Sequence, residues 1–122
     1  MVVRFSDLDP FDHVNHARYL SYFESGRIEA LADRGYGIDA LKASGLHLVL
    51  AKASIEYHRS ARLHDVLEIT TELVVASKTS SVWHQEAHSD GELVATLDVK
   101  SVFTNSDGRP VRAPKGFFEA MA

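Results

Sequence analysis

The chain has 122 residues, with 13 lysines and arginines against 17 aspartates and glutamates, which gives a formal net charge of -4 at pH 7. This length predicts a single domain over residues 1–122, and the acidic balance argues against a nucleic-acid partner, because no basic field would attract phosphates. The absence of cysteine excludes disulfides and a cysteine nucleophile.

The chain begins with a strand-like stretch at residues 2–5 and continues, after a polar loop, into a helical pattern. Asn15 is a suitable N-cap for this helix, because an asparagine side chain accepts a hydrogen bond from one of the first free amides. The helix is predicted to end near Arg34, where Gly35 suits a C-cap. The apolar and aromatic positions that recur at helical spacing are Tyr19, Phe23, Gly26 and Ala30.

After a short helical turn or loop at residues 37–45, the remainder of the chain is predicted to form about four antiparallel strands. Residues 66–75 alternate in polarity, and Asp90-Gly91 between two strand patterns is typical of a type I′ hairpin. The order strand, long helix, strands predicts an α+β fold in which one helix covers an antiparallel sheet. One face of each of two strands consists of Leu67, Ile69, Thr71, Leu73 and Val75, and of Leu93, Ala95, Leu97, Val99, Ser101 and Phe103.

The loop before the helix contains the residues of a candidate active site. Asp9 supplies a carboxylate, and the amides of His16 and Ala17 follow the N-cap Asn15 at the positive end of the helix dipole. Amides in this position can stabilise a developing oxyanion. The sequence therefore predicts an acid and an anion hole as neighbours.

This segment resembles a known family. The resemblance rests on Asp7-Leu-Asp9-Pro-Phe-Asp12-His13-Val14-Asn15-His16-Ala17-Arg18-Tyr19, on Tyr22–Arg27, and on residues 55–69 and 102–114. These stretches are similar to the hotdog-fold acyl-CoA thioesterases of the 4-hydroxybenzoyl-CoA thioesterase type. The resemblance covers nearly the whole chain and implies a hotdog fold, a long helix wrapped by an antiparallel sheet of about five strands.

The resemblance also implies catalytic roles. Asp9, the second aspartate of an Asp-x-Asp pair, is the family's catalytic carboxylate, which acts as a nucleophile on the thioester carbonyl or as a base on water. His16, seven residues further on, stands where a backbone N–H, sometimes with the side chain, meets the thioester oxygen. Asn15 caps the helix that presents this amide and completes the catalytic set.

The sequence departs from the family at three positions: Asp12 replaces a usual glycine, and Ser60 and His64 replace a usual proline and glycine. Structural roles compete with chemical ones in the loop. An aspartate before a proline, as Asp9 is, ordinarily forms a turn. Asp7 is expected to accept hydrogen bonds that shape the loop, and Asp12 to be an alternative N-cap or a solvated side chain.

A metal site is a further interpretation of this loop, because three aspartates lie close to His13 and His16. The segment has neither the i, i+4 histidine pair of a helical zinc site nor the alternating oxygen ligands and distal glutamate of a calcium loop. We therefore expect no metal and no cofactor.

Substrate-binding residues are expected on the helix and in the strand passage that carries the family likeness. Tyr19 lies on the helix that would border the acyl group, although packing of the helix on the sheet is an equally good interpretation. Arg59 and Arg62 are candidates for the phosphates of coenzyme A, because guanidinium groups pair well with anionic oxygens.

We predict that the protein hydrolyses an acyl-CoA thioester to a free acid and CoA. The alternative is a hotdog protein that binds acyl-CoA or an acyl carrier without cleaving it, while a hydratase of the same fold would carry its aspartate and histidine in a different motif along the helix. The resemblance implies a homodimer joined through sheet edges, or a homotetramer, with active sites at the dimer interface. The sequence has no apolar stretch of membrane-spanning length and no signal-peptide pattern, so we expect a cytoplasmic protein without a membrane partner.

Overall fold

The computed structural model describes residues 1–121, apart from the side chain of Val75. The elements in chain order are a 3₁₀ turn at Phe5–Asp7, α1 at His16–Asp33, α2 at Ile38–Ala43, β1 at His47–Tyr57, β2 at Glu68–Ala76, β3 at Ser80–Ser89, β4 at Glu92–Thr104 and α3 at Phe117–Met121. Among the helices of this described part, none is both long and apolar enough to cross a membrane.

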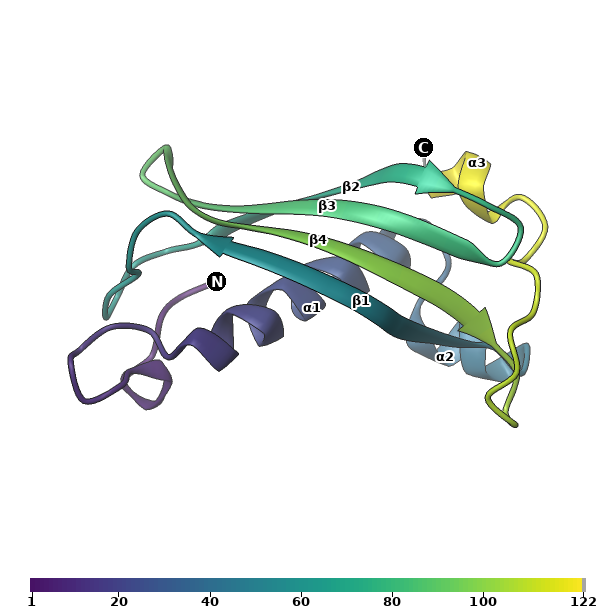
Figure 1. Cartoon of the computed structure of the whole chain (residues 1–122), viewed down its shortest axis with the longest axis horizontal. Helices are drawn as coiled ribbons and strands as arrows, with labels where there is room; N and C mark the ends of the chain where they lie inside the picture. Colours follow the sequence, from purple (N-terminus) through teal and green to yellow (C-terminus); the bar gives the residue numbers. More distant parts are fainter. Residues whose placement is uncertain (122) are drawn as a thin grey trace.

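The four strands form one antiparallel sheet in the order β1-β4-β3-β2, so that β1 and β2 are its edges. Figure 1 shows α1 lying across one face of the sheet, with α2 near the far end of α1 and α3 beside the end of β2. This arrangement confirms the α+β prediction, one long helix against an antiparallel sheet. The short element expected after α1 is the helix α2.

The strand expected at the N-terminus is the exception. Val2 makes a single antiparallel bridge with Val66, and the chain then turns at Phe5–Asp7. The turn is stabilised by the carboxylate of Asp7, which accepts a hydrogen bond from the Arg4 amide at 3.0 Å. Within the described residues the sheet therefore has four strands, and the prediction of about five is corrected.

The helix α1 begins at His16, directly after the predicted N-cap Asn15, whose side-chain oxygen accepts a hydrogen bond from the Ala17 amide at 2.9 Å. It ends at Asp33, followed by Arg34 as the C-cap and by Gly35 with a φ of +83°. The buried side chains of α1 are Tyr19, Tyr22, Phe23 and Leu31. Their burial against the sheet supplies the main force that holds α1 in place.

The alternation predicted for the strands is also present. In and beside β2, Leu67 is buried and Ile69, Thr71 and Leu73 are half-buried, whereas Glu68, Thr70 and Glu72 are exposed. The side chain of Val75, predicted for the inner face, lies outside the described part. In β4, the buried positions include Ala95, Leu97, Val99, Ser101 and Phe103. Asp90 and Gly91 have φ values of +51° and +78°, as the two central residues of a type I′ turn require.

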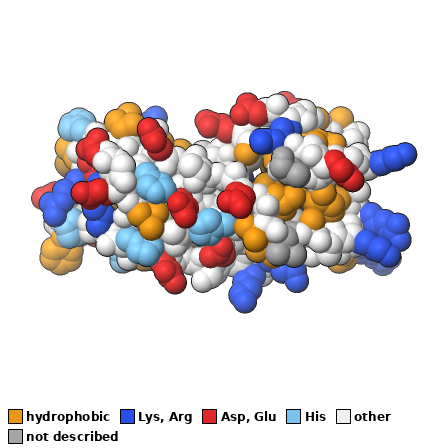
Figure 2. All heavy atoms as spheres, turned by 90° about the horizontal axis from the view of Figure 1, so that it is seen from above, with side chains coloured by type: hydrophobic (Ala, Val, Ile, Leu, Met, Phe, Trp, Pro, Cys, Tyr) orange, Lys and Arg blue, Asp and Glu red, His pale blue; other side chains and the backbone are white. Residues whose placement is uncertain are grey.

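The outer face of the sheet is rich in charged side chains. Figure 2 shows histidine and carboxylate groups gathered over one half of the face that it views. His84 of β3 has its Nδ1 2.8 Å from Asp98 Oδ1 and its Nε2 2.9 Å from Glu86 Oε2. The hydrogen bonds to Glu86 and Asp98 raise the pKa of His84. Trp83, one residue earlier, is buried in the core on the opposite face of the strand.

Gly26 allows α1 to pass close to β2. A Cβ atom on this residue would lie 2.6 Å from Ile69 Cγ2 and 3.3 Å from Gln85 Nε2. Gln85 is fully buried, and its Nε2 donates to the carbonyl of Phe23 at 2.9 Å and to Thr71 Oγ1 at 3.0 Å. A buried amide side chain of β3 therefore ties the backbone of α1 to the sheet.

Gly26→Ala is expected to destabilise the fold. Alanine is better than glycine in a helix by about 1 kcal/mol, but crowding against the stiff Ile69 and the buried Gln85 costs about 1–3 kcal/mol. We expect a net loss of about 1–2 kcal/mol in the free energy of unfolding, measured by urea denaturation. Ser25→Ala, at an exposed position of the same helix, is the control and should change stability by less than about 0.5 kcal/mol. Stabilisation by Gly26→Ala would contradict the close approach.

Candidate active site

The loop between the first turn and α1 is closed by short backbone contacts. Leu8 and Val14 form an antiparallel bridge. Around it, the Asp9 amide donates to the His13 carbonyl and the Asn15 amide donates to the Asp7 carbonyl, each at 2.7 Å. The loop thus returns the chain to the start of α1 and holds Asp9 at a fixed place beside it.

The Asp9 carboxylate is partly occupied by the loop itself. Its Oδ1 accepts hydrogen bonds from the amides of Phe11 at 2.9 Å and His13 at 3.1 Å. No hydrogen bond or ion pair with a described residue engages Oδ2. The turn-forming role predicted for this aspartate is confirmed, and it leaves one oxygen available for another partner.

At the start of α1, one amide remains available. Asn15 engages the next two donors: its side chain accepts from Ala17 and its carbonyl accepts from Arg18 at 2.9 Å. The expectation that the Ala17 amide helps to form an anion hole is therefore corrected, because the cap already uses it. The His16 amide has no hydrogen-bond partner among residues 1–121.

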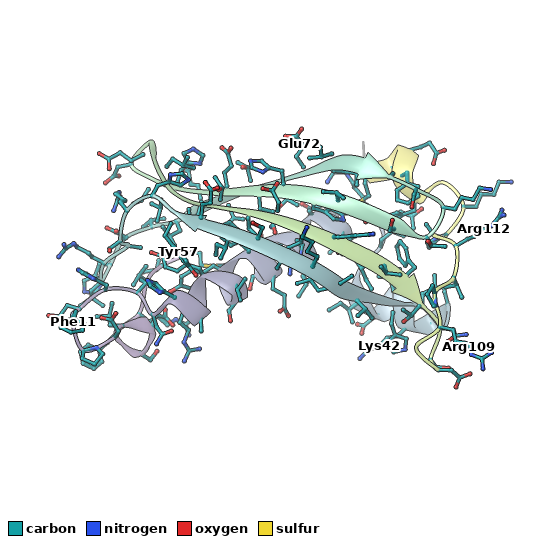
Figure 3. The ribbon with its side chains drawn as sticks, in the orientation of Figure 1. Phe11, Lys42, Tyr57, Glu72, Arg109 and Arg112 are labelled. Carbon is teal, nitrogen blue, oxygen red and sulfur yellow. The ribbon has the colours of Figure 1, made fainter. Side chains whose placement is uncertain are left out.

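Tyr57, at the end of β1, contacts His16 and was not identified by sequence reasoning. Its ring stacks on the imidazole with centroids 4.5 Å apart and an angle of 25°, and its hydroxyl donates to the His16 carbonyl at 3.3 Å. Figure 3 shows Tyr57 at the same end of the molecule as Phe11 of the loop. The only sequence signal was its place in the passage that resembles the family, since these two residues are 41 positions apart.

Tyr19 both packs in the core and lines a pocket, the two roles between which the sequence did not decide. It is buried, and its hydroxyl oxygen accepts a hydrogen bond from the Ala61 amide at 2.9 Å, while the Val14 amide donates to the Ala61 carbonyl at 3.0 Å. Burial raises the pKa of Tyr19. Tyr19 therefore joins α1 to the segment after β1 and also lines a small pocket of about 150 Å³ with His16 and Tyr57.

Arg59 and Arg62 have different surroundings. Arg59 borders the same pocket, but its Nε lies 2.9 Å from Glu92 Oε2 and its Nη1 3.5 Å from Asp65 Oδ2. The contact with Glu92 is an ion pair without the alignment of a hydrogen bond, since Nε has no properly directed acceptor within residues 1–121. Arg62 is exposed. Its backbone amide donates to Asp65 Oδ2 at 3.0 Å and its carbonyl accepts from the Asp65 amide at 3.0 Å, but its guanidinium has no hydrogen bond or ion pair with a described residue. Of the two, Arg62 has the freer guanidinium.

Asp7 anchors the loop, as predicted. Its buried carboxylate accepts a hydrogen bond from the Tyr22 hydroxyl at 2.7 Å, in addition to the bond from the Arg4 amide, and Arg18 Nε lies 3.7 Å away. Burial acts to raise the pKa of Asp7, but the hydrogen bonds from Tyr22 and Arg4 and the charge of Arg18 together lower it below its usual range. Burial and the bond to Asp7 raise the pKa of Tyr22. Asp7 is thus an ionised acceptor that fixes the base of the loop.

Two of the residues that differ from the family pattern adopt a backbone conformation typical of glycine. Asp12 has a φ of +62° and His64 a φ of +68°. This left-handed region strains residues with a Cβ, although aspartate tolerates it better than most. The glycines usual at these positions in the family have a physical reason, and this chain keeps the geometry without them.

His64→Gly is expected to stabilise the protein. Relief of the left-handed strain gains about 1–2 kcal/mol, and the greater freedom of glycine in the unfolded chain costs about 0.5–1 kcal/mol. We expect a net gain of about 0.5–1 kcal/mol in the free energy of unfolding, measured by thermal or chemical denaturation. Arg62→Gly, two residues away and without a positive φ, should instead destabilise. If His64→Gly and Arg62→Gly lowered the free energy of unfolding by similar amounts, His64 would not be strained.

No group of three or more histidine, aspartate or glutamate side chains within residues 1–121 is arranged to hold a metal ion. The groups present at this end of α1 are a carboxylate oxygen, a helix-start amide and the aromatic pair formed by His16 and Tyr57. An electrophilic carbonyl placed between Asp9 and the His16 amide would meet a nucleophile or base on one side and a hydrogen-bond donor on the other.

A hotdog arrangement with an aspartate loop at the start of its helix defines the class of protein. A family model of the thioesterase-like superfamily matches residues 3–121. The chain belongs to this superfamily.

Three known proteins illustrate the likeness. The acyl-CoA thioester hydrolase YbgC of Escherichia coli O157:H7 is 37% identical over 83 residues, which are 68% of this chain and 62% of that protein, so the match spans less than two thirds of the curated relative. The probable thioesterase from Bartonella henselae has a TM-score of 0.90 and 31% identity, covering 93% of this chain and 95% of its own. A thioesterase from Thermus thermophilus, complexed with coenzyme A and Zn, has a TM-score of 0.86 and 32% identity, covering 99% of this chain and 88% of its own.

Proposed function

We propose that the protein is an acyl-CoA thioesterase that hydrolyses its substrate to a free acid and CoA. The observation that carries the proposal is the pairing, at one end of α1, of an Asp9 carboxylate with one unengaged oxygen and a His16 amide without a partner in residues 1–121. Membership of the thioesterase-like superfamily, and the names of YbgC and of the coenzyme A complex, support this choice of reaction.

In the proposed mechanism, the thioester carbonyl accepts a hydrogen bond from the His16 amide, where the helix dipole stabilises negative charge. Asp9 Oδ2 attacks the carbonyl carbon, the C–S bond breaks, and CoA leaves as a thiolate that then takes up a proton. Water hydrolyses the resulting mixed anhydride and regenerates Asp9. In the general-base form, Asp9 instead removes a proton from the water that attacks. Asn15 contributes to this arrangement by capping the helix: it accepts hydrogen bonds from the amides of Ala17 and Arg18, and the His16 amide is left for the substrate.

Substrate binding belongs to the same proposal. Arg62 is exposed two positions after Ser60, which lines the small pocket, and its guanidinium is suited to a CoA phosphate. Arg59 lines the pocket itself, but its guanidinium is already paired with Glu92. Tyr19 also lines the pocket, and its hydroxyl oxygen accepts a hydrogen bond from the Ala61 amide. A cytoplasmic location is also part of this proposal.

Tyr57→Phe is expected to lower kcat/KM for thioester hydrolysis by about 2- to 10-fold, because it removes the hydrogen bond to the His16 carbonyl, which helps to hold His16 and therefore its amide in place. The ring still stacks on His16, so the melting temperature should stay near that of wild type. Steady-state kinetics and a thermal melt measure the two effects. If the folded variant kept the kcat/KM of wild type, Tyr57 would have no role in positioning the His16 amide.

The exposed edge of the sheet supports a homodimer, with a homotetramer as a further step of assembly. Strand β1 has 11 residues, is paired on one side by β4, and exposes Val49, Leu50 and Tyr57 by 46%, 43% and 42%. Long edge strands with apolar side chains readily pair with another strand. Sedimentation analysis should give at least twice the 13.5 kDa mass of one chain.

The experiment that tests the function is release of free thiol from acetyl-, hexanoyl-, palmitoyl- and benzoyl-CoA by wild type and by Asp9→Asn. We expect turnover of at least one substrate by wild type and its loss in the folded variant. Binding of one acyl-CoA without turnover of any would instead support a non-catalytic acyl-binding protein.

A further inference from the structure

A second, larger cavity lies away from the Asp9 loop. Its volume is about 380 Å³, and it is bordered by the second half of α1, by α2 and by the beginning of β1. Figure 3 marks this end of the molecule with Lys42 of α2. The lining is mostly apolar and includes Leu31, Leu41, Leu46, Leu48 and Leu50. Such a volume and lining suit part of a small-molecule ligand.

Arg27 introduces a cation into this apolar lining. Its Nη1 donates to Gln85 Oε1 at 2.8 Å, and Gln85 is held in turn by the Phe23 carbonyl and by Thr71. The guanidinium therefore has a fixed position, set by a fully buried amide. Burial lowers the pKa of Arg27, which reflects the cost of a charge among apolar side chains. Within residues 1–121, no carboxylate forms an ion pair with Arg27.

The other polar groups of the cavity favour an anionic ligand. Lys42 and His47 line it together with Arg27, and the opposing charge is Glu24, which is exposed one turn earlier on α1. Only Nη1 of Arg27 is engaged by Gln85. The rest of the fork keeps the geometry that binds a carboxylate through two parallel hydrogen bonds.

We propose that this cavity receives the far end of the acyl group and that Arg27 pairs with a carboxylate there. The inference rests on the proposed thioesterase function and names its substrate class, the CoA thioesters of dicarboxylic acids. Hydrolysis breaks the thioester C–S bond, water supplies the oxygen and the proton that complete the new acid and the CoA thiol, and the distant carboxylate is unchanged.

The dimer proposed above brings this cavity within reach of the reacting thioester. Within one subunit, Arg27 lies 11 positions after His16 on α1, which is about 16 Å along the helix axis at 1.5 Å per residue. If two β1 strands pair antiparallel about Lys52, the middle residue of His47–Tyr57, Tyr57 of one subunit lies opposite the partner subunit's His47, because both are five positions from Lys52. With this register, the partner's cavity, which is lined by the beginning of its β1, would lie next to Tyr57 and the helix start at His16, where the thioester is proposed to bind.

The test compares matched substrates that differ only in the distant group: hexanoyl-CoA with adipoyl-CoA, and octanoyl-CoA with suberoyl-CoA. Wild type is expected to have a kcat/KM about 10- to 100-fold higher for the dicarboxylic member of at least one pair, as a charge-assisted hydrogen bond would give. Arg27→Gln should abolish this preference and leave kcat/KM for the uncharged member within about 3-fold of wild type. Arg34→Gln removes a charge at the end of the same helix, outside the cavity, and should keep the preference.

Three outcomes decide the matter. Turnover by wild type without a preference for either dicarboxylic substrate overturns the inference but leaves the proposed function standing. The same holds if Arg27→Gln lowers kcat/KM equally for both members of a pair, because the role of Arg27 would then be purely structural. No turnover of any of the four substrates by wild type overturns the proposed function and the inference with it. If Arg27→Gln does not fold, competition of adipate and hexanoate for wild-type hydrolysis decides, with stronger inhibition by adipate expected.

Discussion

Asp9→Asn should lower kcat for thioester hydrolysis by at least about 100-fold, the smaller end of the range for loss of a general base. Asparagine keeps an oxygen that can accept from Phe11 and His13, so the loop can retain its shape. The amide nitrogen that replaces Oδ2 is neither a nucleophile nor a base. The loss should therefore appear in kcat, measured by thiol release, with an unchanged melting temperature.

The matched control for this variant is Asp12→Asn. It removes the same charge from the same loop at an exposed position with no role in the proposed mechanism. Its kcat should stay within about 3-fold of wild type, well short of the loss of a catalytic group. If Asp9→Asn were folded and as active as Asp12→Asn, another group would have to be the nucleophile or base.

Asp7→Ala is expected to give the largest loss of stability, about 2–4 kcal/mol in the free energy of unfolding. The substitution leaves the Tyr22 hydroxyl and the Arg4 amide without their acceptor and removes the charge that faces Arg18. Tyr22→Phe removes one of these contacts and should cost about 1–2 kcal/mol. Chemical denaturation of both single variants and the double variant measures the coupling, and purely additive losses would contradict a direct contact between the two side chains.

The same carboxylate predicts a dependence of stability on pH. Because the pKa of Asp7 is lower in the folded protein than in the unfolded chain, its contribution is present above the unfolded pKa and is lost as the pH falls through the folded one. The free energy of unfolding of wild type should therefore exceed that of Asp7→Asn near neutral pH, and this difference should shrink progressively below about pH 5. Unfolding curves of both proteins between pH 7 and the acid limit of solubility would reveal this, and a constant difference across that range would exclude it.

Local patterns in the sequence predicted much of this fold. The start of α1 depends on the cap Asn15, the hairpin on Asp90-Gly91, and the faces of β2 and β4 on strict alternation, and each of these signals lies within a few residues. The prediction of a strand at residues 2–5 was wrong. The side chain of Asp7 stabilises a turn there, so the chain leaves the sheet before it can form the hydrogen bonds of a strand. Such competition between a local polar contact and a strand is not visible in a pattern of hydrophobic residues.

The candidate site was predicted less completely, because its contacts are distant in the sequence. The loop was found from its motif, and the availability of the His16 amide followed from the cap. The stacking of Tyr57 on His16 and the ion pair of Arg59 with Glu92 depend on how β1 is placed against α1 and β4. No periodicity predicts a pair that only the tertiary arrangement brings together, and the same is true of Gln85 and Arg27.

The edge position of β1 has a consequence for the exchange of its backbone protons with solvent. In an antiparallel edge strand, alternate amides face the neighbouring strand and the others face outward. In an isolated chain, deuterium should therefore replace every second amide proton of β1 quickly and the others slowly, with the alternation interrupted at the register shift between Leu50 and Lys52. Strand pairing with a second copy would slow the fast set alone, so the isotope pattern along one strand records whether the sheet ends at β1 or continues into another molecule.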